Sequence, residues 1–515
     1  MNNKTGYEFN ELKDFLKNSL SLELNTEEKI KAWLEEGLSG SKTEEHTNDP
    51  AAYNLASKLN TEQILSENMQ REITNYLVRL LLGKDEELNT DEDADSEVKS
   101  ILHEVNLQML NNIGWCYYTG SGVEKNFEEA VKWFKKAADG GHPSAQNNLG
   151  WCLKNGDGIK KNLERAAKWF GLAADQGHLP AMNNLAWRFI FGEGVKKNKE
   201  NALKWFTKAA VPGYAPAMCN LGLHHYTGDY IDKDYEQALY WFKLAAPKGY
   251  APAQHSLGLC YYKGDGVEKD FTEALKWFEK AAAQGYMQAE FAIGLCAHNG
   301  EGMDINYEKA FSYFEKAAEK GDTYAQNRLG WYFYQGQGVQ KDLTRAVVWF
   351  SLAARAGLAS AQNNLAWCYK NGEGVEQDML QAANWFKKSA EAGYLLAQCN
   401  LAWRYKLGDS FAKDHKKAVS WFKKAAERGH APSAHCLGLS YYEGEGIAKN
   451  LEKAVEWFKK AAEQDYTLSL YNLGLCYFKG EGVSKDIAAA KDCFQKAAEK
   501  GDENAKYKLE QMNSV

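Results

Sequence analysis

A chain of 515 residues is too long for one compact core, and a hydrophobic content of 44% with 13% aromatic residues excludes a globally disordered protein. The net charge of −7 is uneven, because residues 1–104 carry 11 Lys/Arg and 23 Asp/Glu while the remainder carries 51 and 46. The nearly neutral remainder lacks the basic surface that nucleic acid requires, so no nucleic-acid partner is expected.

The N-terminal region is predicted to be an acidic helical extension over residues 1–67. It begins without the basic and apolar segments of a signal peptide, and the longest apolar stretch, "YLVRLLLG", is too short to span a membrane. We therefore expect a cytoplasmic protein with no membrane insertion and with its ten cysteines reduced. Residues 68–110 are interpreted as a degenerate capping repeat with an acidic linker.

From residue 111 onward, a motif of the type Leu-Gly-Trp-Cys recurs every 36 residues. Its small residue stands at Gly114, Gly150, Ala186, Gly222, Gly258, Gly294, Gly330, Ala366, Ala402, Gly438 and Gly474. We number these units repeats 1 to 11. A fixed period without insertions is typical of a solenoid, whose units bury their apolar faces only against their neighbours.

Each repeat is predicted to hold two helices. In the first, Ala145, Leu149 and Leu153 form one apolar stripe, and Gly150 leaves room for close packing. The pair Gly156 and Gly158 then predicts a loop with positive φ.

In all eleven repeats, Asn or Asp directly precedes the predicted second helix, and these residue types are favoured as N-caps. These caps are Asn126, Asn162, Asn198, Asp234, Asp270, Asn306, Asp342, Asp378, Asp414, Asn450 and Asp486. A left-handed Gly such as Gly141 is expected to end this helix. Because Asp465 replaces that Gly in repeat 10, this repeat is expected to end differently.

The combined pattern, Leu-Gly-x-x-Tyr-x-x-Gly-x-Gly-Val, then Asn or Asp, then Ala-x-x-Trp-Phe-x-x-Ala-Ala-x-x-Gly, resembles the Sel1-like repeat, a relative of the tetratricopeptide repeat, over residues 105–505. The resemblance implies an all-α, right-handed superhelical solenoid of antiparallel helix pairs that serves as a protein-interaction scaffold. Eleven repeats would occupy residues 111–504, and residues 505–515 would form a C-terminal capping helix and tail.

The sequence offers no catalytic constellation, so we predict a protein that is not an enzyme and uses no cofactor or metal. The Gly-x-Gly loops never follow a strand or precede Gly-Lys-Ser/Thr, which excludes a phosphate loop. The Cys at positions equivalent to Cys152 suits helix packing. A metal site joining Cys219 to His224 and His225, or Cys436 to His435, lacks the short ligand spacing of a strong site.

Two rows of side chains on the first helices are the candidate peptide-binding residues. The Asn row comprises Asn112, Asn148, Asn184, Asn220, Asn364 and Asn400. An amide both donates and accepts, so it suits the backbone of a bound peptide. Beside it lie Trp151, Trp187, Trp367 and Trp403, which would add apolar contacts. Alternatively, both rows only connect or pack neighbouring repeats.

Arg188 and Arg404 stand 216 residues apart, and the Trp/Leu alternation beside the Asn row follows the same six-repeat spacing. Differences among repeats favour binding over pure packing, and these two arginines are expected to contact an acidic side chain or a terminal carboxylate.

The predicted function is therefore a non-enzymatic scaffold that binds a peptide or protein partner in the concave groove; the oligomeric state stays open. The resemblance also admits two alternatives, a bacterial effector secreted into a host cell to engage trafficking or signalling proteins, and a regulatory subunit of an enzyme complex.

Overall fold

The computed structural model describes residues 92–513, which form two compact units. The first comprises the described residues up to 257 together with 265–267, and the second comprises 258–264 and 268–513. Within the described residues every regular element is a helix.

The first helices of the repeats, with the last helix of the chain, are α5 (Glu92–Thr119), α7 (Pro143–Asn155), α9 (Leu179–Phe191), α11 (Ala215–Thr227), α13 (Ala251–Lys263), α15 (Met287–Asn299), α17 (Thr323–Gln335), α19 (Ala359–Asn371), α21 (Leu395–Leu407), α23 (Ala431–Glu443), α25 (Thr467–Lys479) and α27 (Glu503–Asn513).

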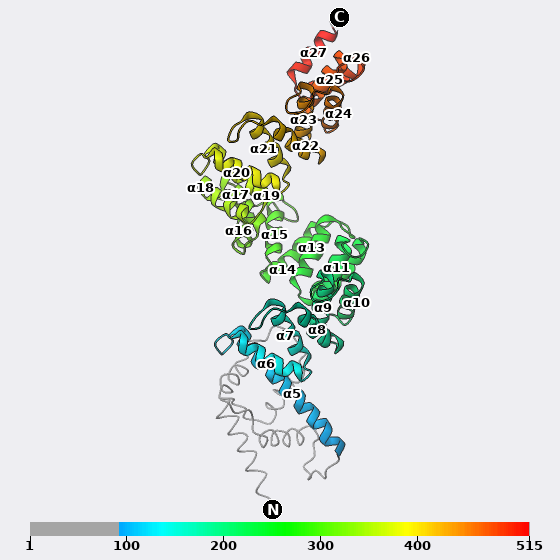
Figure 1. The fold of residues 1–515 in the computed structure, drawn as a ribbon, viewed down its shortest axis with the longest axis vertical. Helices are drawn as coiled ribbons and strands as arrows, with labels where there is room; N and C mark the ends of the chain where they lie inside the picture. Colours follow the sequence, from blue (N-terminus) through cyan, green and yellow to red (C-terminus); the bar gives the residue numbers. More distant parts are fainter. Residues whose placement is uncertain (1–91, 514–515) are drawn as a thin grey trace, which may run out of the picture. The chain divides into compact units, whose positions relative to one another are not determined.

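The second helices are α6 (Phe127–Asp139), α8 (Leu163–Asp175), α10 (Lys199–Ala210), α12 (Tyr235–Ala245), α14 (Phe271–Ala283), α16 (Tyr307–Glu319), α18 (Leu343–Arg355), α20 (Met379–Glu391), α22 (His415–Glu427), α24 (Leu451–Ala462) and α26 (Ile487–Glu499). A 3₁₀ turn, η1 (Ala246–Lys248), extends α12. Within each unit, consecutive helices pack side by side in pairs, as α17 to α20 do in Figure 1.

The core of a repeat is an aromatic ring from the second helix set against a small residue of the first. Phe170 is completely buried, and a Cβ added at Gly150 would lie 2.8 Å from its ring. The predicted stripe of Ala145, Leu149 and Leu153 is buried beside it. The expectation that Gly150 allows close packing of the two helices is therefore confirmed.

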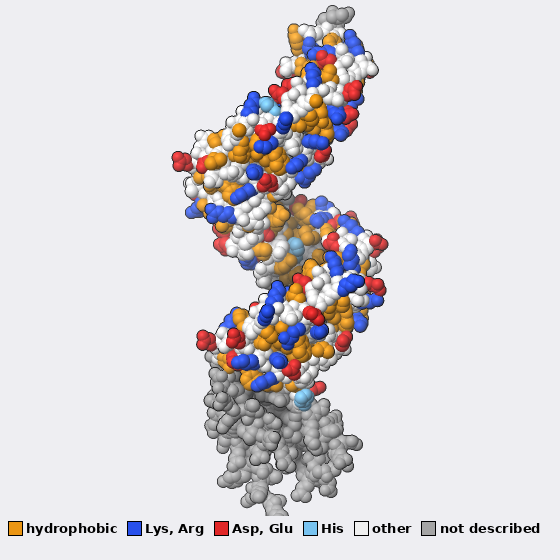
Figure 2. Space-filling model, viewed as in Figure 1, with side chains coloured by type: hydrophobic (Ala, Val, Ile, Leu, Met, Phe, Trp, Pro, Cys, Tyr) orange, Lys and Arg blue, Asp and Glu red, His pale blue; other side chains and the backbone are white. Residues whose placement is uncertain are grey.

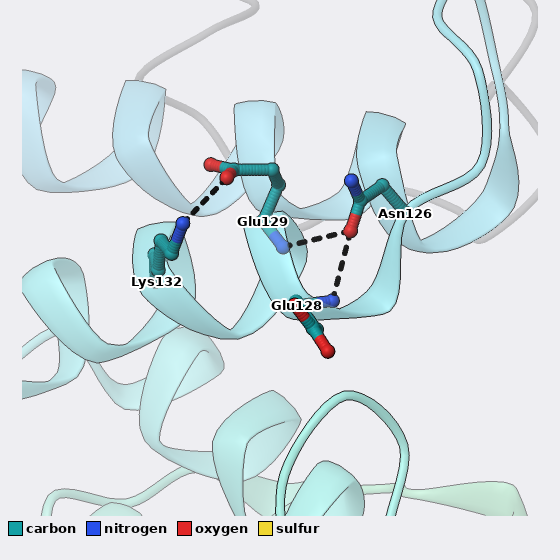
Figure 3. Close-up of polar contacts among 4 residues, drawn as sticks. All are labelled: Asn126, Glu128, Glu129 and Lys132. Carbon is teal, nitrogen blue, oxygen red and sulfur yellow. Dashed lines mark hydrogen bonds and ion pairs between the residues drawn. The ribbon is translucent and has the colours of Figure 1, made fainter.

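The eleven predicted N-caps are all confirmed. In each, the Asn or Asp side chain accepts a hydrogen bond from a backbone N–H in the first turn of its second helix. Asn126 accepts from the N–H groups of both Glu128 and Glu129, at 3.1 Å each (Figure 3). Lys132 pairs with Glu129 one turn later.

The loop glycines are required by two independent constraints. Gly158 has φ of 64°, and a Cβ placed on it would lie 2.1 Å from the carbonyl oxygen of Phe127 in the preceding repeat. Ser410 nevertheless takes φ of 94° at the equivalent position. At Tyr230, the other departure, the side chain packs edge-on against His224 with ring centroids 5.0 Å apart.

One expectation about the repeat ends is wrong. Asp465 adopts φ of 60°, close to the 87° of Gly429, and Tyr466 N–H bonds to Ala461 as His430 N–H bonds to Ala425. The tenth repeat therefore keeps the common turn, because Asp tolerates the left-handed region better than most residues.

Upstream of the array, α5 runs without interruption from Glu92 to Thr119. It therefore includes the end of the acidic linker expected within residues 68–110. The rest of that segment and the extension over residues 1–67 lie outside the described residues. At the other end, Leu509 and Met512 of α27 pack against a cluster that contains Phe494. None of the described helices is long and apolar enough to span a membrane.

Candidate functional site

The Asn row is held in place by hydrogen bonds between repeats. Asn148 Nδ2 donates to Asn111 Oδ1 at 2.9 Å, and Asn184 Nδ2 donates to Asn147 Oδ1 at 2.9 Å. The same bond, always between residues 37 apart, joins Asn220 to Asn183 at 2.8 Å, Asn364 to Asn327 at 2.9 Å and Asn400 to Asn363 at 3.1 Å. Asn112 instead accepts from Gln108 within α5. We call the side chains of this row and of the Trp row beside it the first-helix face.

The acceptors of these bonds were not among the residues singled out from the sequence. They are Asn111, Asn147, Asn183, Asn327 and Asn363, each standing directly before a position of the Asn row. The visible signal was the repeated Asn-Asn doublet, of which only the second member was interpreted. Asn147 is 8% exposed, so the acceptor belongs to the interior between two repeats.

The donors keep part of their hydrogen-bonding capacity. Asn148 and Asn184 are half-buried. Each uses one N–H in the bond to the preceding repeat, and no other described residue bonds to its Oδ1 or its second N–H. An amide can make about four hydrogen bonds, so these side chains are oriented without being saturated.

The Trp row packs onto the second helix of its own repeat. Trp151 meets Phe170 edge-on with centroids 6.1 Å apart, and Trp367 meets Phe386 at 5.6 Å. Trp187 and Trp403 are likewise half-buried and edge-on to Phe206 and Phe422. These rings therefore have a packing role, and each leaves part of its surface on the first-helix face.

Arg188 and Arg404 lie in the interior and already have acidic partners. Arg188 is 5% exposed and pairs with Glu193 of the loop that follows α9. Arg404, 8% exposed, pairs with Asp409 at 2.6 Å. Both guanidinium groups therefore hold the loop that follows their helix, and neither belongs to the first-helix face.

The cysteines equivalent to Cys152 are packed as the sequence indicated. Cys152, Cys260, Cys296, Cys368 and Cys476 are at most 2% exposed, and Cys116 is half-buried. Burial raises the pKa of the Cys152, Cys296 and Cys368 thiols to about 12, so these thiols stay protonated. Among the described residues, no three His, Cys, Asp or Glu side chains are grouped to hold a metal ion.

The surface carries no single sign of charge on the face in view in Figure 2, where Lys and Arg side chains alternate with Asp and Glu. Many of the lysines on the second helices lie over an aromatic ring one turn earlier, as Lys280 Nζ does 3.9 Å from the centroid of Trp277. Such contacts cover the outer Trp of the repeat.

Comparison with known proteins decides the family. The model of the Sel1 repeat matches eleven times between residues 108 and 502, with each match covering one helix pair: 108–142, 143–178, 179–210, 215–250, 251–286, 288–322, 323–358, 359–394, 395–430, 432–466 and 467–502. The chain belongs to the Sel1 repeat family. The eleven Sel1 repeats form an all-α repeat solenoid, the scaffold architecture that in this family generally mediates protein–protein interaction.

Two solved structures are similar over most of their own length. The protein c5321, a protective antigen present in uropathogenic Escherichia coli strains, is 32% identical with a TM-score of 0.58, over 79% of this chain and 87% of that chain. A Sel1 repeat protein from Oxalobacter formigenes is 30% identical with a TM-score of 0.49, over 60% and 90% respectively. No curated protein matches the chain.

Proposed function

We propose that the first-helix face binds an extended segment of a protein partner through the Asn row, in a scaffold that performs no catalysis. This proposal is carried by the donor amides, which are fixed in orientation but keep hydrogen-bonding groups unused. Each donor Asn is half-exposed, is fixed by its neighbour's Oδ1 and retains a free oxygen and one free N–H.

Fixed amides suit a peptide backbone for a thermodynamic reason. A bound extended chain presents alternating N–H and C=O groups, and an amide that already holds its rotamer loses little conformational entropy on binding them. The half-exposed Trp151 and Trp187 stand beside the row and supply apolar area with few torsions to immobilise.

The test compares two triple variants that remove the same three bonds between repeats. The donor variant carries Ala at Asn148, Asn184 and Asn220, and the acceptor variant carries Ala at Asn111, Asn147 and Asn183. Both lose the hydrogen bonds between neighbouring first helices, but only the donor variant loses the exposed amides.

Both variants and wild type are used as bait in lysate of the source organism, after circular dichroism has shown equal helix content. Partners retained by the acceptor variant and lost from the donor variant support binding by the Asn row. Partners retained by both, or lost equally from both, contradict it, because the bond between repeats would then explain the whole effect.

A second candidate role is that of a secreted factor that engages host proteins. It is favoured by the likeness to c5321, which is a protective antigen of a pathogen. The test fuses a translocation reporter to the full chain and to a form lacking its last twenty residues. Reporter activity inside host cells for the full chain alone supports export, and its absence for both forms leaves a scaffold that acts within the producing cell.

A further inference from the structure

A pocket of about 320 Å³ opens on the first helices of the second unit. It is lined by His298 of α15, by Arg328, Trp331, Tyr332 and Gln335 of α17, and by Gln337 of the loop after α17. This volume is at the lower end of small-ligand sites, enough for one side chain or one chain end.

Three of these residues depart from the repeat pattern at the same place. Arg328 stands where the Asn row has Asn148 and Asn364. His298 stands where five other repeats have Tyr, namely Tyr118, Tyr226, Tyr262, Tyr334 and Tyr442. In repeats 2 to 11 the residue that directly follows the first loop Gly, equivalent to Asp157 after Gly156, is Asp or Glu in every case except Gln337.

In other repeats, that loop carboxylate accepts a hydrogen bond from the preceding repeat. Tyr118 donates to Asp157 at 2.9 Å, Tyr226 to Asp265 at 2.6 Å, Tyr334 to Glu373 at 2.9 Å and Tyr442 to Glu481 at 2.6 Å. At the pocket, His298 and Gln337 replace both partners of this bond. The repeat has thus lost a carboxylate where it has gained a guanidinium.

His298 and Tyr332 form a hydrogen-bonded, uncharged pair at the pocket. Burial and the charge of Arg328 lower the pKa of His298, and burial raises the pKa of Tyr332 to about 12. The Tyr332 hydroxyl and His298 Nδ1 share a hydrogen bond of 2.7 Å, so this ring nitrogen has its partner within the fold.

The guanidinium of Arg328 is unpaired within the described part of the chain. Its side chain is exposed, no Asp or Glu lies within ion-pair distance, and none of the six lining residues is acidic. The pocket therefore combines a cation, the imidazole of His298, two Gln amides and the indole of Trp331, with no anion to balance them.

We propose that this pocket binds a carboxylate of the partner segment, which takes the place of the loop carboxylate that repeat 7 lacks. The proposal rests on the peptide-binding function above and adds the chemistry that the partner must carry. The guanidinium of Arg328 engages the carboxylate, and Trp331 packs against the neighbouring apolar part. Either an Asp or Glu side chain or a chain-end carboxylate supplies this group.

The experiment selects random heptapeptides on the full chain, from one library with free C-terminal carboxylates and one with amidated C-termini. Wild type is compared with Arg328→Gln and with the control Arg345→Gln, which removes one exposed positive charge from α18 outside the pocket. Loss of a charged hydrogen-bonded pair is expected to lower the enrichment of carboxylate peptides on Arg328→Gln by about tenfold or more. Enrichment on Arg345→Gln should equal that of wild type.

The two libraries identify the source of the carboxylate. Asp or Glu selected from the amidated library assigns a side chain, and selection confined to free ends assigns the chain end. Equal carboxylate enrichment on all three proteins, or selection without carboxylates, overturns the proposal.

The donor variant at Asn148, Asn184 and Asn220 separates this inference from the proposed function. If that variant loses peptides that Arg328→Gln keeps, only the carboxylate site is overturned. If wild type selects no peptide at all, both proposals fail.

Discussion

Asp465 shows at the scale of one residue how far a repeat tolerates a departure from its pattern. Its φ of 60° is one of two positive values among the described non-Gly residues, and the other belongs to Ser410. The left-handed region costs an L-residue about 1–2 kcal/mol, and somewhat less for Asp.

Asp465→Gly should therefore stabilise the protein by about 0.5–1 kcal/mol. The urea midpoint of the full chain measures this. Asp465→Ala is the matched control, since it also removes the 3.4 Å pair with Lys500 but keeps the Cβ. A stabilisation by Ala as large as that by Gly would show that the backbone conformation is not the cause.

Single residues also mark the limit of what the sequence could predict. The caps and the packing Gly follow from local rules, which a residue and its near neighbours satisfy alone. The bond from Asn184 to Asn147 depends on which side chain of the next repeat comes within 3 Å, and periodicity gives no such distance. The exposure of the Asn row was therefore predictable, whereas its acceptor row was not.

At the scale of the helix, the N-caps should contribute measurably. Asn162 accepts from the Arg165 N–H at 2.9 Å and satisfies one of the otherwise free donors at the start of α8. Asn162→Ala is expected to cost about 1 kcal/mol, measured as a shift in the urea midpoint.

Glu164→Ala is the control for that substitution, because it lies in the same turn and makes only an exposed 3.5 Å pair with Lys168. Its effect should stay within about 0.5 kcal/mol. Equal losses from the two substitutions would contradict a specific capping role for Asn162.

The helices and their caps were the features that the sequence predicted best. Helix pairs, caps and buried stripes are repeated eleven times, so each pattern could be checked against ten others. The pocket could not be predicted in this way, because it is made of departures from the repeated pattern. Arg328, His298 and Gln337 each look like an isolated substitution in its own row, and only the packing of α17 on α15 brings the three together.

For the whole molecule, buried histidines make stability depend on pH. His435 is 5% exposed, bonds to Ser469 at 2.9 Å and, because of desolvation, has its pKa lowered to about 4 from the ordinary 6.5. It is neutral in the fold, whereas the unfolded chain gains a proton below pH 6.5. Stability from this group is therefore complete above pH 6.5 and is lost as the pH falls toward 4.

At pH 5, that linkage amounts to about 2 kcal/mol for His435. His435→Asn should therefore reduce the drop in urea midpoint between pH 7.5 and pH 5. The exposed His103→Asn is the control and should keep the wild-type drop. An unchanged drop in His435→Asn would show that other groups set the pH dependence.

The buried thiols also report how often each repeat opens. Nine of the eleven repeats contain cysteine, and the packed ones react with an alkylating reagent only when their own repeat opens. Timed labelling followed by peptide mass spectrometry would thus rank the repeats by opening frequency without any engineered probe. Because neighbours share interfaces, a partner seated on a few repeats would slow the labelling of those repeats first.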